Sequence, residues 1–288
     1  MTLAKSLATQ GAPHGTWVLA ECQTAGRGRR GRTWQSQARG GVYMTLLLRP
    51  AASADLAGLS LVFGMAARTA LLQTLKAHAD VAAHDIIKLK WPNDIVVADR
   101  KLGGVLLEVD GLGSAQPVLR VGLGLNVAPA DSLSLAPELA QRYIGLMQLA
   151  PDAHALPEAA TAFCAAAARE QTEQKAQMWV HSLAQALVGT CYEAYTLWAQ
   201  KGLQPTLSAW PVCDALLGRS VVAQTGAARV VGVAQGIGPD GRLKLASPAG
   251  CVWVDSGEVH MAAAHRANHG DLTQSGAAVY IGLTPEAR

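Results

Sequence analysis

Residues 90–104 read KWPNDIVVADRKLGG, and residues 121–127 read VGLGLNV. In the first stretch, short apolar runs alternate with two turn signals, Pro92-Asn93-Asp94 and Asp99-Arg100-Lys101, so we expect short strands joined by tight turns. The second stretch predicts another strand, and its two glycines leave room beside the sheet for a ligand or a neighbouring backbone. Together the two stretches predict antiparallel strands grouped around an open surface.

An earlier segment, residues 21–34, reads ECQTAGRGRRGRTW and is called the arginine loop below. Glycine lets the backbone adopt positive φ and approach a ligand closely, while the planar guanidinium group of arginine matches carboxylate and phosphate oxygens. No Lys-Ser or Lys-Thr pair follows the last glycine, so the segment is not a Walker A element. The loop suits a small, enclosed anion. A solvated basic turn and an arginine-rich RNA-binding patch are the alternatives.

The pattern around these stretches groups a few helices with many short strands. Residues 55–79 place apolar side chains at spacings of three and four, which predicts a helix facing the core. Residues 2–10 predict a short helix, and residues 129–156 a loop with a short helix in it. Residues 157–200 predict a mostly helical, alanine-rich segment that is broken once, near Gly189 or earlier. The strands expected in this part are Trp17–Cys22, Gly41–Leu48, Ile86–Lys90, Asp94–Ala98, Val105–Val109 and Val118–Leu125. Such grouping favours an α+β fold over alternating βαβ units.

The character of the sequence changes from Pro211 onward. Residues 238–241 read GPDG, a strong turn signal, and residues 263–288 lack an apolar period and predict a loose tail. The strands expected around that turn are Val221–Ala223, Val230–Ala234, Leu243–Ala246 and Val252–Val254. We therefore expect a small all-β unit at the end of the ordered chain.

Composition bounds the class of protein. Of the 288 residues, half are hydrophobic and 16% are charged, and the net charge of +3 is too small to indicate a general nucleic-acid surface. No apolar run approaches the roughly 18–20 residues that span a bilayer, and the N-terminus has no signal-peptide pattern. The five cysteines are scattered without a CxxC pair. We therefore expect a cytoplasmic protein with reduced thiols, without a disulfide framework or a zinc site.

The motifs GRGRRG, KWPND…RKLGG and VGLGLNV, in this order and spacing, resemble the catalytic core of the biotin protein ligases, the biotin–[acetyl-CoA-carboxylase] ligases. The resemblance runs from about Thr2 to about Met261. It implies a catalytic domain over residues 1–208 with a mixed, mostly antiparallel sheet and flanking helices, similar to class II synthetases. A small SH3-like barrel over residues 209–262 and a flexible tail over residues 263–288 would follow.

The helix-turn-helix of repressor-type ligases has no counterpart in this sequence. The resemblance is therefore to the monofunctional type without an N-terminal DNA-binding domain, and no nucleic-acid or membrane partner is expected. Biotin ligases also carry a Ser-Thr-Asn-like motif whose hydroxyls help to bind the biotin ring system. Here that place falls at Met1-Thr2-Leu3-Ala4-Lys5, which resembles the second half of the motif. We expect the native chain to begin upstream, with a first strand and Ser-Thr before Met1. The alternative is that the chain starts at Met1 and that Thr2 substitutes for the missing hydroxyl residues of the motif.

The resemblance implies a two-step reaction that uses ATP, biotin and Mg²⁺. Biotin is activated as biotinyl-5′-AMP with release of pyrophosphate, and biotin then passes to a lysine of a biotin carboxyl carrier protein of acetyl-CoA carboxylase or a related carboxylase. The first step joins two anions, so the protein must mainly neutralise charge and align the reactants. Members of the family also form homodimers through the central sheet, so a homodimer is a further expectation.

The resemblance also assigns residues to this chemistry. Arg27 and Lys101 would be the catalytic residues that bracket the biotin carboxylate and the α-phosphate. The residues expected to bind biotin or its adenylate are Gln23, Gly26, Arg27, Gly28, Arg29, Lys101, Gly104, Leu106 and Gly122. The residues expected near the nucleotide are Trp34, Lys90, Asn93, Asp94 and Asn126. No metal ligand can be assigned from the sequence.

Plainer interpretations stay open beside these. Trp34 and Trp91 could also be aromatic residues of the core. Asp94 could simply begin a turn, and Lys101 could be an ordinary lysine in a turn. Lipoate ligases and octanoyltransferases share a related fold, but their motifs do not match the GRGRRG and KWPND blocks. A binding module without enzymatic activity is the remaining alternative.

Overall fold

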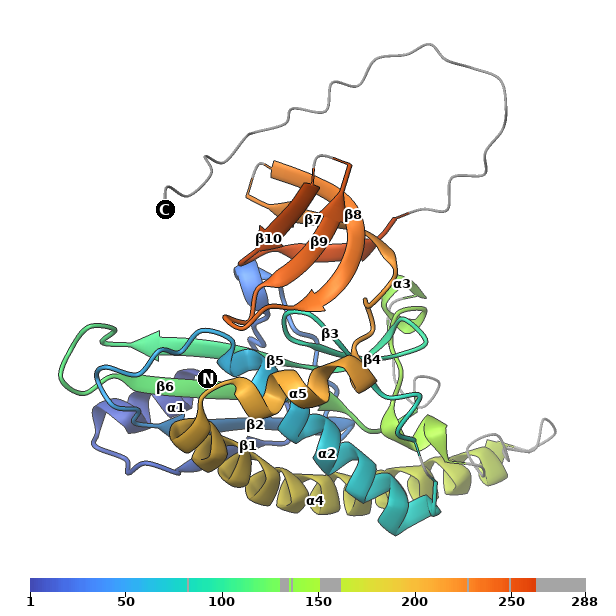
Figure 1. Cartoon of the computed structure of the whole chain (residues 1–288). Helices are drawn as coiled ribbons and strands as arrows, with labels where there is room; N and C mark the ends of the chain where they lie inside the picture. The colour runs from blue at the N-terminus through green and yellow to red at the C-terminus, as the bar shows by residue number, and fades with distance from the viewer. Residues whose placement is uncertain are drawn as a thin grey trace, which may run out of the picture.

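The structure is a computed structural model that describes residues 1–81, 83–129, 135, 137–150, 162–226, 228–248 and 250–262, and only the backbone of residues 162–169. The described residues form a six-stranded sheet and a five-stranded sheet. Long helices lie along one face of the larger sheet, and the smaller sheet lies on the opposite side (Figure 1). The expected α+β architecture is confirmed. The predicted tail, residues 263–288, lies outside the described residues.

The six-stranded sheet has the order β1-β2-β6-β5-β4-β3, and each strand is antiparallel to its neighbours. The expected sheet was mixed and mostly antiparallel; no parallel pairing joins two of the described strands, so the antiparallel part of the prediction is confirmed. The strands are β1 (Trp17–Ala20), β2 (Gly41–Leu48), β3 (Lys88–Lys90), β4 (Asp94–Val97), β5 (Arg100–Asp110) and β6 (Val118–Asn126). Strand β2 coincides with its prediction because all eight of its residues are buried.

One turn was predicted in the wrong place. The sequence suggested a turn over Asp99-Arg100-Lys101, but Arg100 already pairs with Val97 as the first residue of β5. The turn consists of Ala98 and Asp99 alone, with φ of 46° and 63°. A two-residue connection with positive φ at both positions matches the twist of a β-hairpin. Lys101 therefore lies on a strand, where its side chain has a fixed direction.

Helices α2 and α4 pack together and cover one face of the sheet (Figure 1). The predicted apolar stripe of α2 is core: Leu59, Phe63, Ala66 and Ala70 are all at most 4% exposed. The α-helices in the described residues are α1 (Thr2–Thr9), α2 (Leu59–Ala79), α3 (Pro137–Ala140), α4 (Ala162–Lys201) and α5 (Gln204–Cys213). The same part of the chain also contains two 3-10 helices, η1 (Arg29–Gly31) and η3 (Leu146–Leu149).

Helix α4 is continuous, and the predicted break near Gly189 is wrong. Glycine inside a helix costs only about 1 kcal/mol relative to alanine. The neighbouring Leu187 and Cys191 are fully buried against the core, and this packing holds the helix together across the glycine.

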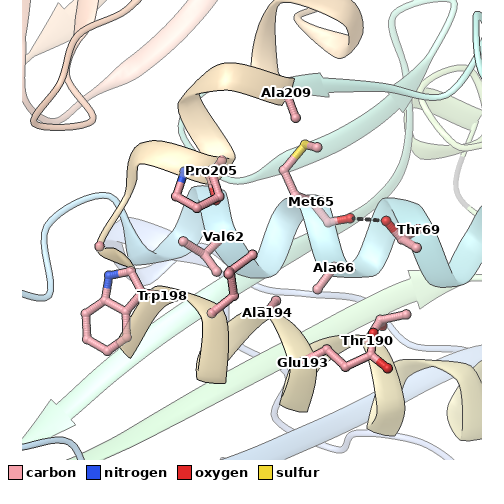
Figure 2. A pocket seen from close by; sticks show the side chains of 13 residues that line it. Val62, Met65, Ala66, Thr69, Thr190, Glu193, Ala194, Trp198, Pro205 and Ala209 are labelled. Carbon is pink, nitrogen blue, oxygen red and sulfur yellow. Dashed lines mark hydrogen bonds between the residues drawn. The ribbon is translucent and has the colours of Figure 1, made fainter. Parts of the chain in front are cut away.

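The three helices α2, α4 and α5 leave a cavity of about 260 Å³ between them (Figure 2). Val62, Met65 and Ala66 line it from α2, while Pro205 and Ala209 line it from α5. Glu193 is the one charged residue among those that line it. This cavity therefore offers no cation to an anionic ligand.

The smaller sheet forms a separate antiparallel β domain of order β10-β9-β8-β7-β11. Its strands are β7 (Ser220–Thr225), β8 (Ala228–Ile237), β9 (Leu243–Ser247), β10 (Gly250–Val254) and β11 (Glu258–Met261). The predicted turn at 238–241 is confirmed, because Gly238 N donates to Arg242 O at 2.8 Å and Gly241 N donates to Gly238 O at 2.9 Å. The predicted domain boundary at residue 209 falls inside α5, which packs on α2 and α4.

Specific contacts fix the β domain over the larger sheet. The indole Nε1 of Trp91, a residue only 2% exposed, donates to Gly241 O at 2.9 Å. Arg219 forms a two-pronged ion pair with Asp99 in the β4–β5 turn, with both N–O distances at 2.8 Å. The expectation that Trp91 is a core aromatic is confirmed, and its core is the junction between the two sheets.

Candidate active site

The arginine loop folds into a small hairpin. Trp34 N donates to Gly26 O at 2.9 Å, and Gly28 N donates to Arg32 O at 2.7 Å. The tip turns back through Arg30 and Gly31, whose φ values are 57° and 75°. A Cβ on Gly26 would collide with the carbonyl oxygen of Trp34, so glycine is required for the two sides of the hairpin to approach.

The tip of this loop contacts the β domain through three of its arginines. Arg29 Nη1 donates to the carbonyl oxygen of Gly257 at 3.4 Å, and Arg30 Nη1 donates to that of Gln224 at 3.4 Å. Arg32 forms an ion pair with Glu258. The tip of the loop is therefore held in place by the β domain.

Arg29 also connects the loop to the KWPND motif. Its Nη1 lies 3.3 Å from Oδ1 of Asn93. Burial lowers the pKa of Arg29 from its usual value, while the nearby Asp94 carboxylate raises it. Asn93 in turn donates from Nδ2 to Val105 O at 2.9 Å, so its side chain is fixed by β5.

The floor beneath the loop is made of glycines on β5 and β6. Gly104 pairs with Gly124, and Leu106 pairs with Gly122. Trp34 lies on this floor, because a Cβ on Gly124 would sit 2.8 Å from Cζ2 of its indole ring. At Gly122 a Cβ would sit 3.0 Å from the sulfur of Met1. The missing side chains are therefore what opens the sheet surface.

Lys101 and Asp94 form the central charged pair of the floor. Nζ of Lys101 lies 2.7 Å from Oδ1 of Asp94 and 5.3 Å from the centre of the Trp34 ring. Asn126 Nδ2 donates to Lys101 O at 3.0 Å, which fixes the backbone of the lysine. A Cβ on Gly104 would sit 3.3 Å from Asp94 Oδ1, so glycine lets this pair lie close to the sheet.

Two further ionisable groups line the same space. Burial lowers the pKa of Lys90, although Asp94 and Asp99 act in the opposite direction. Burial raises the pKa of Tyr43 to about 12, and its hydroxyl donates to Gln37 O at 3.0 Å. Tyr43 is therefore protonated at neutral pH and cannot act as a base.

These groups surround a cavity of about 500 Å³ between the arginine loop, the sheet and the β domain. Seven arginines and lysines line it against four aspartates and glutamates. The predicted site residues that line it are Gln23, Arg27, Gly28, Arg29, Trp34, Lys90, Asn93, Asp94, Lys101, Gly104, Leu106, Gly122 and Asn126. Gly26 lies in the hairpin behind this lining. The excess of cations in this lining suits an anionic ligand.

Several lining residues were missed from the sequence. Arg30 and Arg32 lie inside the quoted motif, so their charge was a usable signal. Asp99 lies inside the KWPND…RKLGG stretch, where the sequence suggested only a turn. Others come from distant segments and carry no local signal: Tyr43, Glu138, Arg142, Glu258 and His260. Among the described residues there is no group of three or more His, Cys, Asp or Glu that could hold a metal ion.

Comparison with known families defines the class of protein. The model of the Biotin/lipoate A/B protein ligase family matches residues 1–126, and the model of the Biotin protein ligase C terminal domain matches residues 216–261. The first match covers the arginine loop and the glycine floor, and the second covers the β domain. The fold is thus that of the biotin and lipoate protein ligase family.

Individual relatives narrow this class. The biotin–[acetyl-CoA-carboxylase] ligase of Paracoccus denitrificans is 34% identical over 243 residues, which cover 84% of this chain and 89% of that protein. The chain belongs to the biotin protein ligase family. The bifunctional ligase/repressor BirA of Escherichia coli strain K12 is 31% identical, and the match covers 80% of this chain but 61% of that longer relative.

Solved structures agree at the level of the fold. The biotin protein ligase from Aquifex aeolicus in complex with biotin and ATP has a TM-score of 0.62 at 23% identity, over 90% of this chain and 94% of that one. The Leishmania major enzyme in complex with biotinyl-5-AMP has a TM-score of 0.51 at 21% identity, over 88% and 94%. In the part of this chain that the structure describes, no helix is long and apolar enough to cross a membrane.

Proposed function

We propose that the chain activates biotin with ATP as biotinyl-5′-AMP and then transfers biotin to a lysine of a biotin carboxyl carrier protein. The observation that carries the proposal is the meeting of the arginine loop with Lys101 over a floor of glycines. Relatives with this fold have been solved with biotin and ATP and with biotinyl-5-AMP, which supports the same ligands here. The acceptor would belong to acetyl-CoA carboxylase, after the name of the Paracoccus denitrificans relative, or to a related carboxylase.

The first step, formation of the adenylate, requires the negative charges of the two reactants to be neutralised. A carboxylate oxygen of biotin attacks the α-phosphorus of ATP, and the bond to the β-phosphate breaks to release pyrophosphate. Both reactants are anions, so cations on either side lower the cost of bringing them together. Arg27 from the loop and Lys101 from β5 are the two groups proposed for this, and Arg29 would hold the adenylate beneath the loop. No covalent enzyme nucleophile is required.

The second step needs enclosure more than new catalytic groups. The acceptor amine attacks the acyl carbon of the mixed anhydride, AMP leaves, and the amine releases a proton. Water would compete for the anhydride, so the loop and the β domain together must cover it. The contacts of Arg29, Arg30 and Arg32 with the β domain support this covering role.

Biotin and the nucleotide are proposed to occupy different parts of the cavity. Gln23, Gly104, Leu106 and Gly122 would contact biotin, because the glycines leave a flat apolar surface for its ring system. On the nucleotide side, the residues proposed are Trp34, Lys90, Asn93, Asp94 and Asn126. Trp34 already lies against Gly124, and its indole ring would supply a stacking contact with adenine.

Mg²⁺ is proposed to enter with the phosphates of ATP. Mg²⁺ is commonly bound through one or two carboxylates together with substrate phosphates, and it keeps several waters. Asp94 is the carboxylate that fits this part, since it faces the cavity beside Asn93. When bound, the ion would neutralise charge on the phosphates, and the residues of the chain need supply only a partial ligand set.

Exchange of labelled pyrophosphate into ATP tests this function. We expect exchange that depends on biotin and that lipoate or octanoate does not support. The first family model covers lipoate as well as biotin ligases, so these controls are informative. Exchange with lipoate but not biotin would move the chain to the other branch of the family, and no exchange with any of the three acids would refute the proposal.

A further inference from the structure

Arg27, one of the two cations proposed for catalysis, is paired with a carboxylate in this structure. Its Nη2 lies 3.5 Å from Oε1 of Glu108. Glu108 also contacts Arg120, with 2.8 Å between Oε2 and Nη1, and Arg120 contacts Asp110 at 2.7 Å. Lys5 of α1 lies 3.4 Å from Asp110. Positive and negative groups thus alternate from the arginine loop to the first helix.

The two guanidinium groups beside Glu108 differ in their freedom. The side chain of Arg120 is 4% exposed, and it lies on β6 directly opposite Glu108 on β5. The side chain of Arg27 is 49% exposed, and it comes from a loop. Arg120 is therefore the permanent partner of Glu108, and Arg27 is the exchangeable one.

Glu108 lies on the same face of the sheet as the cavity floor. Side chains alternate between the two faces of a strand, so Glu108 points to the same side as Gly104 and Leu106. The carboxylate thus continues the row of residues that line the cavity. It sits where it can reach the arginine without entering the space of a ligand.

We propose that Glu108 is a positioning residue that holds Arg27 beside the cavity until an anionic reactant replaces Glu108 as the partner of Arg27. The inference rests on the proposed function, because it needs Arg27 to meet the carboxylate or phosphate of a reactant. Departure of Arg27 leaves no unpaired buried charge, since Arg120 remains against Glu108. The exchange is therefore easy, and Glu108 competes with the reactant for one cation.

This competition predicts the direction in which the affinity for ATP changes when Glu108 is replaced. In Glu108→Gln the arginine has no competing partner, and one negative charge beside the incoming phosphates is removed. We expect the Kd for ATP with Mg²⁺, measured by calorimetry without biotin, to fall about two- to fivefold, the range that an exposed ion pair is typically worth. The difference should shrink at high ionic strength, because salt screens exposed charges. A residue with a merely structural role would weaken binding when changed.

Asp110→Asn is the matched control. It removes the other carboxylate of Arg120 but does not contact Arg27, so the affinity for ATP should stay at the wild-type value. In an Arg27→Met background, Glu108→Gln should strengthen binding less than it does in the wild type, because only the removal of the negative charge then contributes. If Glu108→Gln does not fold, Glu108→Asp retains the charge beside Arg120 while shortening the reach to Arg27, and a smaller tightening in the same direction is expected.

The outcomes separate this inference from the function on which it rests. Wild-type chain that shows no biotin-dependent pyrophosphate exchange would refute the function. Active wild type, together with a Glu108→Gln affinity that is unchanged or weaker, would overturn the role of Glu108 alone. An equal gain in affinity with and without Arg27 would also overturn it, because the effect would then not pass through that arginine.

Discussion

The two faces of the six-stranded sheet are built from the same strands but differ in composition and burial. On the face covered by α2 and α4, Val105, Val121 and Leu125 are at most 1% exposed and pack into one apolar core. On the other face the same strands present Gly104 and Gly124, and charged groups gather over them. The first face supplies stability and the second supplies the site. Changes on the two faces should therefore separate folding from activity.

Leu125→Ala changes the core face, and we expect it to have the largest effect, a loss of stability. Removing a fully buried leucine leaves a cavity and typically lowers the free energy of unfolding by about 2–5 kcal/mol. Urea unfolding measures this loss. The folded fraction should keep its rate of pyrophosphate exchange. The control is Leu112→Ala, because Leu112 is 78% exposed and should leave the unfolding curve nearly unchanged.

Lys101→Ala changes the site face, and we expect it to lower the rate of pyrophosphate exchange while leaving stability nearly unchanged. Loss of one cation facing developing negative charge typically raises a barrier by about 3–4 kcal/mol, or 10²–10³ in rate. Stability should change little, because the side chain is 39% exposed. Lys244→Ala on the β domain is the control. Near-normal exchange by Lys101→Ala would mean that the lysine does not face the reacting groups.

Gly124→Ala tests the glycine floor directly. The new Cβ would lie 2.8 Å from the Trp34 ring, so the indole must shift from its place. We expect the affinity for ATP to fall about tenfold, or ~1.4 kcal/mol. Gly189→Ala is the matched control, because nothing lies within 4 Å of that site in α4. Equal ATP affinities for the two variants would show that the position of Trp34 is unimportant.

Glu258→Gln tests the contact between the loop and the β domain and should have the smallest effect. It removes the partner of Arg32, an ion pair that is partly exposed and typically worth about 0.2–1 kcal/mol. Release of biotinyl-5′-AMP should become up to about fivefold faster, as followed by dilution of labelled adenylate. Asp240→Asn, which removes a surface partner of Arg242 on the same domain, should leave release unchanged.

The sequence predicted the core face better than the site face. Strand β2 was predicted at its observed residues because an uninterrupted apolar run has one interpretation. Strand β5 was predicted too short, since RKLGG contains two charges and two glycines that read as a turn. Those glycines are needed by tertiary contacts: a Cβ on Gly103 would lie 2.7 Å from Gly124 O. No local pattern contains that information.

The site residues show the same division. Those carried by the GRGRRG and KWPND motifs lie together around one cavity, although their roles stay proposals. Glu258 and His260 line the same cavity from more than 150 residues further along the chain. Arg142 reaches it from the segment after β6. Only the packing of the β domain and of that segment onto the sheet brings these residues in, so spacing within a motif could not reveal them.

Direct detection of the adenylate tests the central claim that the glycine-floored face makes biotinyl-5′-AMP. The chain is mixed with biotin, Mg²⁺ and ATP labelled at the α-phosphate, without an acceptor protein, and the bound product is separated and counted. We expect close to one biotinyl-5′-AMP per folded molecule for the wild type and for Leu125→Ala, and almost none for Lys101→Ala in the same time. Absence of the adenylate from the wild type, or an equal amount in Lys101→Ala, would contradict the account.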